Sequence, residues 1–115
     1  MKHTDELLFR KAEKAILTHK LFLKEDMSRG VLNRYVHIPK NKFAPLFRQF
    51  TGMGFPKYIN SLRLAYAAEQ LKQHPEYKIE SIAHECGIPV TQTFYRLFKA
   101  EFGETPSSFK QRYAK

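Results

Sequence analysis

Residues 78–109 read KIESIAHECGIPVTQTFYRLFKAEFGETPSSF, and this stretch decides the fold. Apolar residues recur at helical spacing in its first part, until a Gly-Ile-Pro turn at 87–89 interrupts the pattern. A second helical pattern, richer in polar and basic residues, follows and stops at Gly103. We therefore predict helices near 79–86 and 90–102. A short helix, a tight turn and a polar helix form the arrangement that inserts a helix into the major groove of DNA.

The same pattern occurs about fifty residues earlier in the chain. Six positions of its second helix and the following segment recur 51 residues later: Phe43, Leu46, Phe47, Arg48, Gly52 and Tyr58 match Phe94, Leu97, Phe98, Lys99, Gly103 and Phe109. The preceding Ile-Pro turn at 38–39 recurs at 88–89, which is a displacement of 50. One residue has therefore been gained or lost at the turn or at the start of the second helix. Two copies are too few for a solenoid, so the repeat predicts two helix-turn-helix units.

The rest of the chain is also helical in pattern. We predict helices over 5–20, with Thr4 as the cap, over 29–37 and over about 41–51, and a final short helix from 106 to 113. His19 and Tyr35 are expected on the inner faces of the first two. No stretch alternates with the period of a strand.

The predicted fold is therefore all-α, with about seven helices. Residues 1–56 form a first helix-turn-helix subdomain, 57–74 a long linker helix and 75–115 a second subdomain. At about 1.5 Å per residue, the 18-residue linker spans roughly 27 Å, which suits a strut between DNA segments about 34 Å apart.

Composition points to a polyanionic partner. The chain has 115 residues, a formal net charge of +9 and a pI near 9.8, which is strongly basic for a small domain. Its 43% hydrophobic residues suffice for a packed core. A single cysteine excludes an internal disulfide and fits a reducing compartment. The first ten residues lack the apolar run of a secretory signal, and no window is apolar enough to span a membrane.

Catalytic and metal-binding motifs are missing from the sequence. His84 and Glu85 begin like a zinc-protease helix, but Ile88 stands where the second histidine would be. The five histidines show no ligand spacing, Cys86 has no thiol partner, and there is no glycine-rich phosphate loop. We expect no enzymatic activity, no metal and no cofactor.

The two-unit pattern resembles the DNA-binding domain of AraC/XylS-type transcription regulators over residues 5–112. The signature of the second unit comprises Ile82-Ala83, Gly87-Ile88, Phe94-Tyr95-Arg96-Leu97-Phe98-Lys99, Gly103, Thr105-Pro106 and Phe109. The linker carries Tyr58-Ile59, Leu62-Arg63, Ala67 and Leu71. Ile88 replaces the usual phenylalanine, which we expect to alter packing only. The resemblance implies a seven-helix domain whose two recognition helices enter successive major-groove segments on one face of DNA.

Candidate base readers lie in the second recognition helix. Thr91, Gln92, Tyr95 and Arg96 align with the positions that contact bases in the family. Glutamine pairs with adenine and arginine with guanine through two hydrogen bonds each, whereas threonine bonds a base or touches a thymine methyl. For Arg96 a phosphate contact or a surface ion pair is the alternative, and Tyr95 could equally lie on a sugar or phosphate.

The first unit departs from this pattern. Its counterparts of the four readers are Asn41, Lys42, Ala44 and Pro45, and the last two cannot form side-chain hydrogen bonds. Proline is costly deep in a helix, so we expect this helix to start late, with Asn41 or Lys42 as its cap. We expect this unit to read fewer bases, through Asn41 alone.

Phosphate contacts position a protein on DNA without specifying sequence. The candidates for these contacts are Lys40, Lys42, Arg48, Lys57 and Lys99, with Lys110 and Arg112 as further cations.

The expected function is sequence-specific binding of double-stranded DNA in transcription regulation. Two alternatives stay open, namely a helical protein-interaction module and a non-specific nucleic-acid binder that retain the fold. RNA polymerase and a missing sensor or dimerisation domain are further candidate partners implied by the resemblance. We expect a cytoplasmic, nucleoid-associated bacterial protein without membrane contact through this segment.

Overall fold

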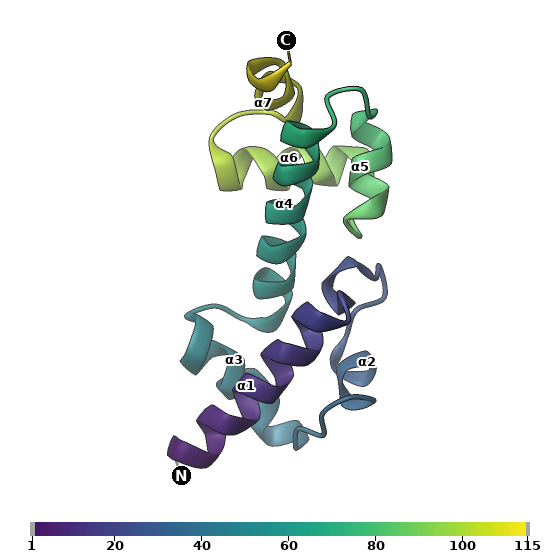
Figure 1. The fold of residues 1–115 in the computed structure, drawn as a ribbon. Helices are drawn as coiled ribbons and strands as arrows, with labels where there is room; N and C mark the ends of the chain where they lie inside the picture. Colours follow the sequence, from purple (N-terminus) through teal and green to yellow (C-terminus); the bar gives the residue numbers. More distant parts are fainter. Residues whose placement is uncertain (1, 115) are drawn as a thin grey trace. The chain divides into compact units, whose positions relative to one another are not determined.

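The computed structural model describes residues 2–114, with side chains from residue 4 onward. This part of the chain forms seven α-helices and one short 3-10 helix, η1, and contains no strand (Figure 1). In chain order they are α1 (Lys2–Thr18), η1 (Leu21–Leu23), α2 (Arg29–Asn33), α3 (Lys40–Thr51), α4 (Phe55–Gln73), α5 (Ile79–Glu85), α6 (Thr91–Phe102) and α7 (Pro106–Tyr113). The predicted all-α fold with about seven helices is confirmed.

Contacts divide the chain into two compact units, 1–60 and 61–115, and the division falls inside α4. The helix therefore supplies side chains to both cores. Tyr58 and Ile59 are buried in the first unit, whereas Leu64 and Leu71 are buried in the second. The finer division predicted from the sequence, with a separate linker over 57–74, stays a prediction.

The core of the first unit is an aromatic cluster built by α1, α3 and the start of α4. The ring of Phe47 lies at its centre, 5.5 Å from Phe9, 4.9 Å from Phe55 and 5.6 Å from Tyr58 between centroids. Phe9 also stacks on Phe50 at 5.2 Å. These rings join three helices in one apolar centre and fix α3 against α1.

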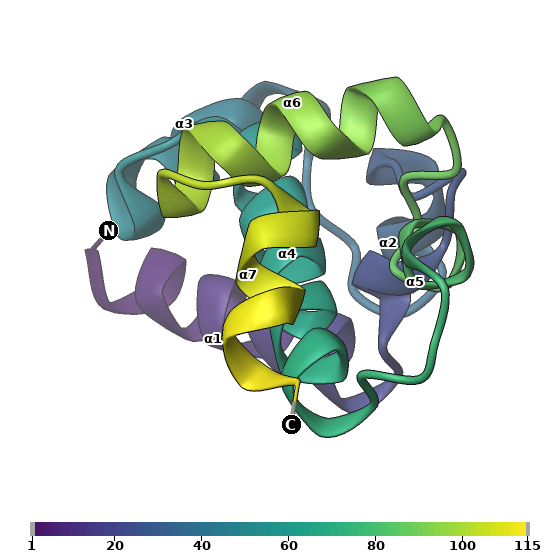
Figure 2. The ribbon, with the colours of Figure 1, turned by 90° about the horizontal axis from the view of Figure 1, so that it is seen from above.

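The core of the second unit uses the same plan with α6 and α7. Phe98 is fully buried, and its ring meets Phe94 at 5.7 Å and Phe109 edge-on at 5.3 Å. The Lys72 ammonium from α4 lies 5.3 Å from the centre of the Tyr113 ring in α7. Figure 2 shows α7 crossing α4 and running in a different direction from α6.

The repeat seen in the sequence is present in the coordinates. α3 and α6 each have 12 residues, and both bounds of α3 recur in α6 after 51 residues. Both helices end at a glycine in the left-handed conformation, Gly52 with φ 77° and Gly103 with φ 78°. Each glycine N–H donates to the carbonyl four residues back, which closes the helix end in the same way.

The extra residue of the second unit is Val90. Pro39 directly precedes the first residue of α3, whereas Val90 separates Pro89 from the first residue of α6. The sequence left two places open for this change, the turn and the start of the second helix. The structure assigns it to the start of the helix.

Several local expectations were wrong in the first unit. α1 begins at Lys2, so Thr4 lies inside the helix and is not its cap. His19 and Tyr35 are exposed, with ring centroids 4.7 Å apart, and are not core residues. α1 instead buries Phe9, a core position that the sequence reading did not single out. None of the helices within residues 2–114 combines the length and apolarity that a membrane crossing needs.

Candidate nucleic-acid interface

One face of α6 is polar and open to solvent. Phe94 and Phe98 are buried on the opposite side, while Gln92, Arg96 and Lys99 are exposed. Residues spaced by four and seven lie on one side of a helix, so these three side chains share a face. Within residues 4–114, neither Arg96 nor Lys99 forms an ion pair, and both cations are free to meet an anion.

Thr91 and Tyr95 lie on the flank of α6 rather than on this face. Both are half-buried, and the Tyr95 hydroxyl lies 2.9 Å from the Ser107 hydroxyl in the first turn of α7. The four residues predicted to read bases are thus divided between two sides of the helix. Gln92 and Arg96 point to solvent, whereas Tyr95 already has a partner in the protein.

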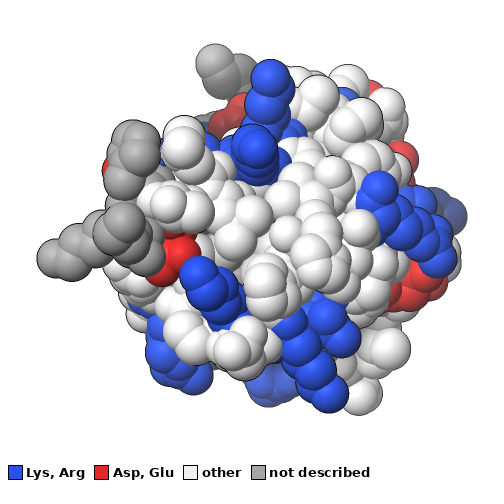
Figure 3. All heavy atoms as spheres, turned by 90° about the horizontal axis from the view of Figure 1, so that it is seen from below, with Lys and Arg blue, Asp and Glu red and all other residues white. Residues whose placement is uncertain are grey.

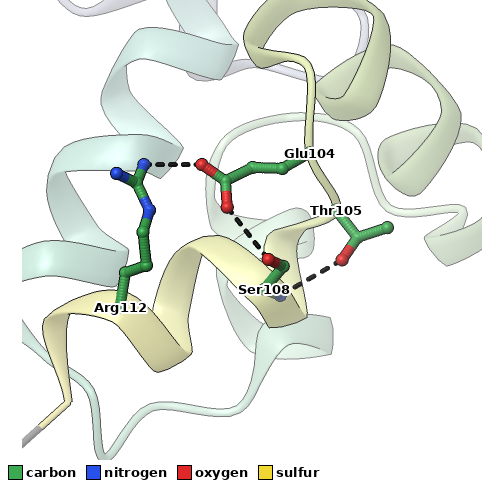
Figure 4. Close-up of polar contacts among 4 residues, drawn as sticks. All are labelled: Glu104, Thr105, Ser108 and Arg112. Atoms are coloured by element: carbon green, nitrogen blue, oxygen red, sulfur yellow. Dashed lines mark hydrogen bonds and ion pairs between the residues drawn. The ribbon is translucent and has the colours of Figure 1, made fainter.

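A hydrogen-bonded cluster holds the start of α7 (Figure 4). The Thr105 hydroxyl accepts from the Ser108 N–H at 3.1 Å and caps the helix. The Ser108 hydroxyl donates to Glu104 at 3.0 Å, and Arg112 donates to the other oxygen of that carboxylate at 2.5 Å. This cluster keeps the first turn of α7 in a defined position beside α6.

Two cations near the chain end are engaged inside the second unit. Arg112 binds Glu104, and its guanidinium lies 5.5 Å from the Phe109 ring centre. The Lys110 ammonium donates to the Tyr77 carbonyl at 2.6 Å. Both had been considered as phosphate ligands, but either would have to leave a partner to reach DNA.

The first recognition helix differs from the sequence-based expectation at its start. Its cap residue is Pro39, and α3 begins at Lys40, so neither Asn41 nor Lys42 is the cap. Pro45 is the sixth residue and lies in the second turn. It cannot donate the backbone hydrogen bond to the Asn41 carbonyl that an α-helix would otherwise contain. Both residues are exposed, so water can satisfy that carbonyl.

This start also changes the correspondence between the two units. Because the helices superpose at a displacement of 51, Lys40 matches Thr91 and Asn41 matches Gln92. The sequence reading had paired Asn41 and Lys42 with these residues, which is wrong by one position. Ala44 still corresponds to Tyr95, and Pro45 to Arg96, as the sequence predicted.

The remaining predicted phosphate ligands lie on three parts of the first unit. Lys42 forms a partly exposed ion pair, because its ammonium lies 3.2 Å from the Asp5 carboxylate on α1. A Cβ added to Gly54 would lie 3.8 Å from the Arg48 guanidinium, which places this cation beside the α3–α4 turn. Lys40 and Lys57 are exposed at the starts of α3 and α4.

Two exposed residues, one in α3 and one directly before α6, were missed by the sequence reading. Gln49 follows Arg48 on α3, four residues after Pro45, and its amide is open to solvent. The spacing of the buried residues Phe43 and Phe47 could have identified it, because Gln49 falls outside their face. Val90 is exposed directly before α6, and no periodic signal marks it because it precedes the helix.

Positive charge is distributed over the surface in several groups. Seen from below in Figure 3, Lys and Arg side chains form separate clusters around a largely uncharged centre. No group of three or more His, Cys, Asp or Glu side chains among the described residues could hold a metal ion. Within the second unit, the open polar face of α6 carries Arg96 and Lys99 beside Gln92, and these side chains suit a polyanion that also presents hydrogen-bonding groups.

Comparison with known proteins identifies the family. The model of the helix-turn-helix domain family matches residues 32–112, which is more than half of the chain. The chain belongs to the AraC-type helix-turn-helix family. It is a DNA-binding domain of the kind used in transcription regulation.

Regulators of the AraC type are similar to this chain over most of its length. The regulatory protein PocR of Salmonella typhimurium is 28% identical over 89% of the chain and 33% of its own length. The transcriptional activator RhaR of Yersinia pseudotuberculosis is 38% identical over 59% of the chain and 23% of its own length. The chain thus spans about a quarter to a third of these relatives.

The fold also matches a solved structure of the family. The DNA-binding domain of AdpA, a global transcriptional factor crystallised with a target DNA, has a TM-score of 0.77 and 18% identity. The match covers 90% of this chain and 92% of that domain. At this identity the comparison establishes the shared fold.

Proposed function

We propose that the chain binds double-stranded DNA sequence-specifically through α6, with Gln92 and Arg96 reading base edges in the major groove. The observation that carries this proposal is the exposed pair itself, one helical turn apart on the open face of α6 and without an ion pair within residues 4–114. The Arg96 guanidinium can donate to the two major-groove acceptors of guanine, and the Gln92 amide can donate to and accept from adenine. The AdpA domain, which has the same fold, was crystallised with a target DNA.

Thr91 and Tyr95 have supporting roles in this proposal. Their half-buried position on the flank of α6 suits contacts with the sugar-phosphate backbone beside the reading face. Lys99 follows Arg96 on the same face and suits a phosphate contact. These contacts fix the depth and register of α6 without adding base preference.

In this proposal, the first unit mainly positions the protein on DNA through phosphate contacts and recognises few bases. α3 enters a second major-groove segment, where Asn41 is its one predicted base reader. Lys40, Lys42, Arg48 and Lys57 contact phosphates, and Lys42 exchanges Asp5 for a phosphate on binding. The exposed and apolar Ala44 and Pro45 support this division, because they offer no hydrogen bonds. Residues 57–74 serve as the linker between the two reading units.

The chain acts, in this proposal, as the DNA-binding part of a longer bacterial regulator. Its relatives are about two and a half times as long as the chain, which leaves room for a sensing or dimerisation domain. RhaR is named a transcriptional activator, and RNA polymerase is accordingly a candidate partner in the cytoplasm. The family is one of DNA-binding regulators, and we propose no catalytic activity for this segment.

Selection from a random DNA pool tests the proposal with the wild type and three variants. Arg96→Ala should relax the preference at one or two positions and cost about 1–3 kcal/mol at the selected site. Asn41→Ala should relax one position in the other half of the site. Arg10→Ala, which removes an exposed arginine of α1, should leave the selected sequence unchanged.

Two outcomes would contradict the proposal. If Arg96→Ala and Asn41→Ala select the wild-type sequence with undiminished preference, the assigned readers are wrong. If the wild type selects no sequence and merely binds all DNA at low salt, a non-specific function replaces the proposed one. Failure to bind at low salt would favour the protein-interaction alternative.

A further inference from the structure

Val90 stands out as an exposed apolar residue at the start of α6. Its side chain is 59% exposed, the highest value among the large hydrophobic residues that are exposed in the described chain. Its carbonyl accepts the first helical hydrogen bond, from the Phe94 N–H at 2.9 Å, so it is the cap residue of the helix. An exposed valine at this place gains nothing from burial in the protein.

The cap position makes this choice more unusual. Ser, Thr, Asp and Asn are preferred there because their side chains accept a hydrogen bond from the first turn, and valine is among the poorest choices. The protein uses hydroxyl caps elsewhere: Ser28 caps α2 and Thr105 caps α7. Both recognition helices lack a side-chain cap and start after an apolar residue, Pro39 or Val90. Departures from local rules of this kind are expected at functional positions.

The location of Val90 coincides with the end of α6 that approaches the bases. In helix-turn-helix proteins, the N-terminal residues of the recognition helix contact base edges. Val90 lies directly before Thr91 and two residues before Gln92. It is also the residue that the second unit has in addition to the first, so the first unit has no counterpart for its isopropyl group. Apolar side chains recognise the C5 methyl group of thymine, which is the one apolar feature of the major groove.

We propose that Val90 determines specificity by packing its isopropyl group against the C5 methyl of a thymine beside the bases read by Gln92 and Arg96. The inference rests on the proposed function, since it requires that α6 enters the major groove. It adds a reader of a different chemistry, because recognition through an apolar contact needs no hydrogen bond. The cost of an uncapped helix is then explained by the contact that the valine makes with DNA.

Replacement of single thymines by uracil tests this inference, because the exchange removes the C5 methyl group and leaves the base-pairing edge and the other major-groove acceptors intact. The site is the one selected by the wild type, and each thymine is replaced in turn. For the wild type, uracil at one position adjoining the Gln92 and Arg96 bases should weaken binding about fourfold, the factor expected for one buried methyl group. Val90→Ser should bind the thymine and uracil sites equally at that position.

Further variants separate reading from folding. Val90→Ser supplies a capping hydroxyl and should unfold at a temperature equal to or above that of the wild type. Val90→Thr keeps one methyl group and should retain part of the thymine preference. Leu7→Ser, a matched change of another exposed apolar residue, should retain all of it.

The outcomes distinguish this inference from the proposed function. If the wild type selects a DNA sequence but Val90→Ser keeps the full loss at every uracil position, the role of Val90 is refuted and the function stands. If the wild type selects no sequence, the proposed function fails, and the inference fails with it.

Discussion

Cys86 carries the single thiol of the chain, and it lies fully buried in the second unit. Its thiol donates to the Ala83 carbonyl at 3.3 Å, one turn back in α5. Burial raises the pKa of the Cys86 thiol from 9.0 to about 11. The residue is therefore a small apolar core residue with an unreactive thiol.

The raised pKa predicts how the stability of the protein depends on alkaline pH. Above pH 9 the unfolded chain loses the Cys86 proton, whereas the native state keeps it until about pH 11. The thiol thus contributes stability below pH 9 that is lost as pH rises to 11, by up to about 2–3 kcal/mol. Urea unfolding of the wild type and Cys86→Ala should show this difference, since the alanine variant lacks the titration. A constant difference between the two proteins over pH 8.5–11 would contradict it.

At the scale of single residues, helical periodicity predicts which face of a helix a residue lies on, but not which residue of another helix it contacts. Gln92 and Arg96 were predicted as base readers from the family resemblance, and both are exposed on the open face of α6. The partner of Tyr95 could not be predicted, because Ser107 lies in another helix and the contact depends on how α7 packs. For the same reason, the ion pair of Lys42 with Asp5 could not be predicted, because the two residues are 37 positions apart and lie in different helices.

At the element scale, the two recognition helices end in the same way. Gly52 and Gly103 adopt left-handed φ angles of 77° and 78°, and a Cβ added to either meets no atom within 4 Å. Alanine at either site should therefore destabilise through its backbone conformation alone, by about 1–2 kcal/mol. Thermal unfolding of Gly52→Ala and Gly103→Ala should show losses of similar size.

Gly30→Ala is the matched control for this pair. Gly30 lies in α2 without a positive φ, and its added Cβ would lie at an ordinary 3.6 Å from the Ser28 hydroxyl. This variant should gain up to about 1 kcal/mol of stability. Neutral effects at Gly52 and Gly103 would show that the helix ends relax without cost.

Pro45 makes α3 less stable than its sequence length suggests. Replacement by alanine restores the backbone hydrogen bond to the Asn41 carbonyl and removes the clash of the ring with the preceding turn. The gain is reduced by the extra freedom of the unfolded chain, which leaves about 1–2 kcal/mol. Urea unfolding should therefore show a higher midpoint for Pro45→Ala. Arg96→Ala changes the equivalent exposed position of α6 and should leave the midpoint nearly unchanged, whereas a loss at Pro45→Ala would mean that α3 requires the proline.

The existence of the helices was predictable from the sequence, whereas several of their starts were not. The repeat, the Ile-Pro turns and the terminal glycines identified the two recognition helices and their ends, whereas the helix predicted over 29–37 already ends at Asn33. The starts of α3 and α6 each differ by one residue from the prediction, and neither Pro39 nor Val90 is a residue that capping preferences select. The late start expected for α3 came from applying the proline rule to Pro45, a rule that this exposed helix violates.

At the scale of the whole molecule, the number of phosphates that its cations contact sets the salt dependence of DNA binding. Five phosphate contacts, from Lys40, Lys42, Arg48, Lys57 and Lys99, should give a log–log slope of about −4 to −5 between affinity and salt concentration. Fluorescence anisotropy over 50–300 mM salt measures this slope. Lys99→Ala should reduce its magnitude by about one and weaken binding to selected and random DNA equally. A slope near zero would exclude the proposed phosphate contacts.

The continuity of α4 limits how this protein can be dissected into fragments. The boundary between the units follows Asn60, six residues into a helix of 19. A fragment ending there would present Tyr58 and Ile59 to its core from a helical stub far shorter than the roughly 12–15 residues that hold a helix in water. A fragment starting at Ser61 would begin in mid-helix without a cap. Each unit therefore has its own core, but both cores need side chains from α4. A fragment expressed to study one unit must include the whole of α4.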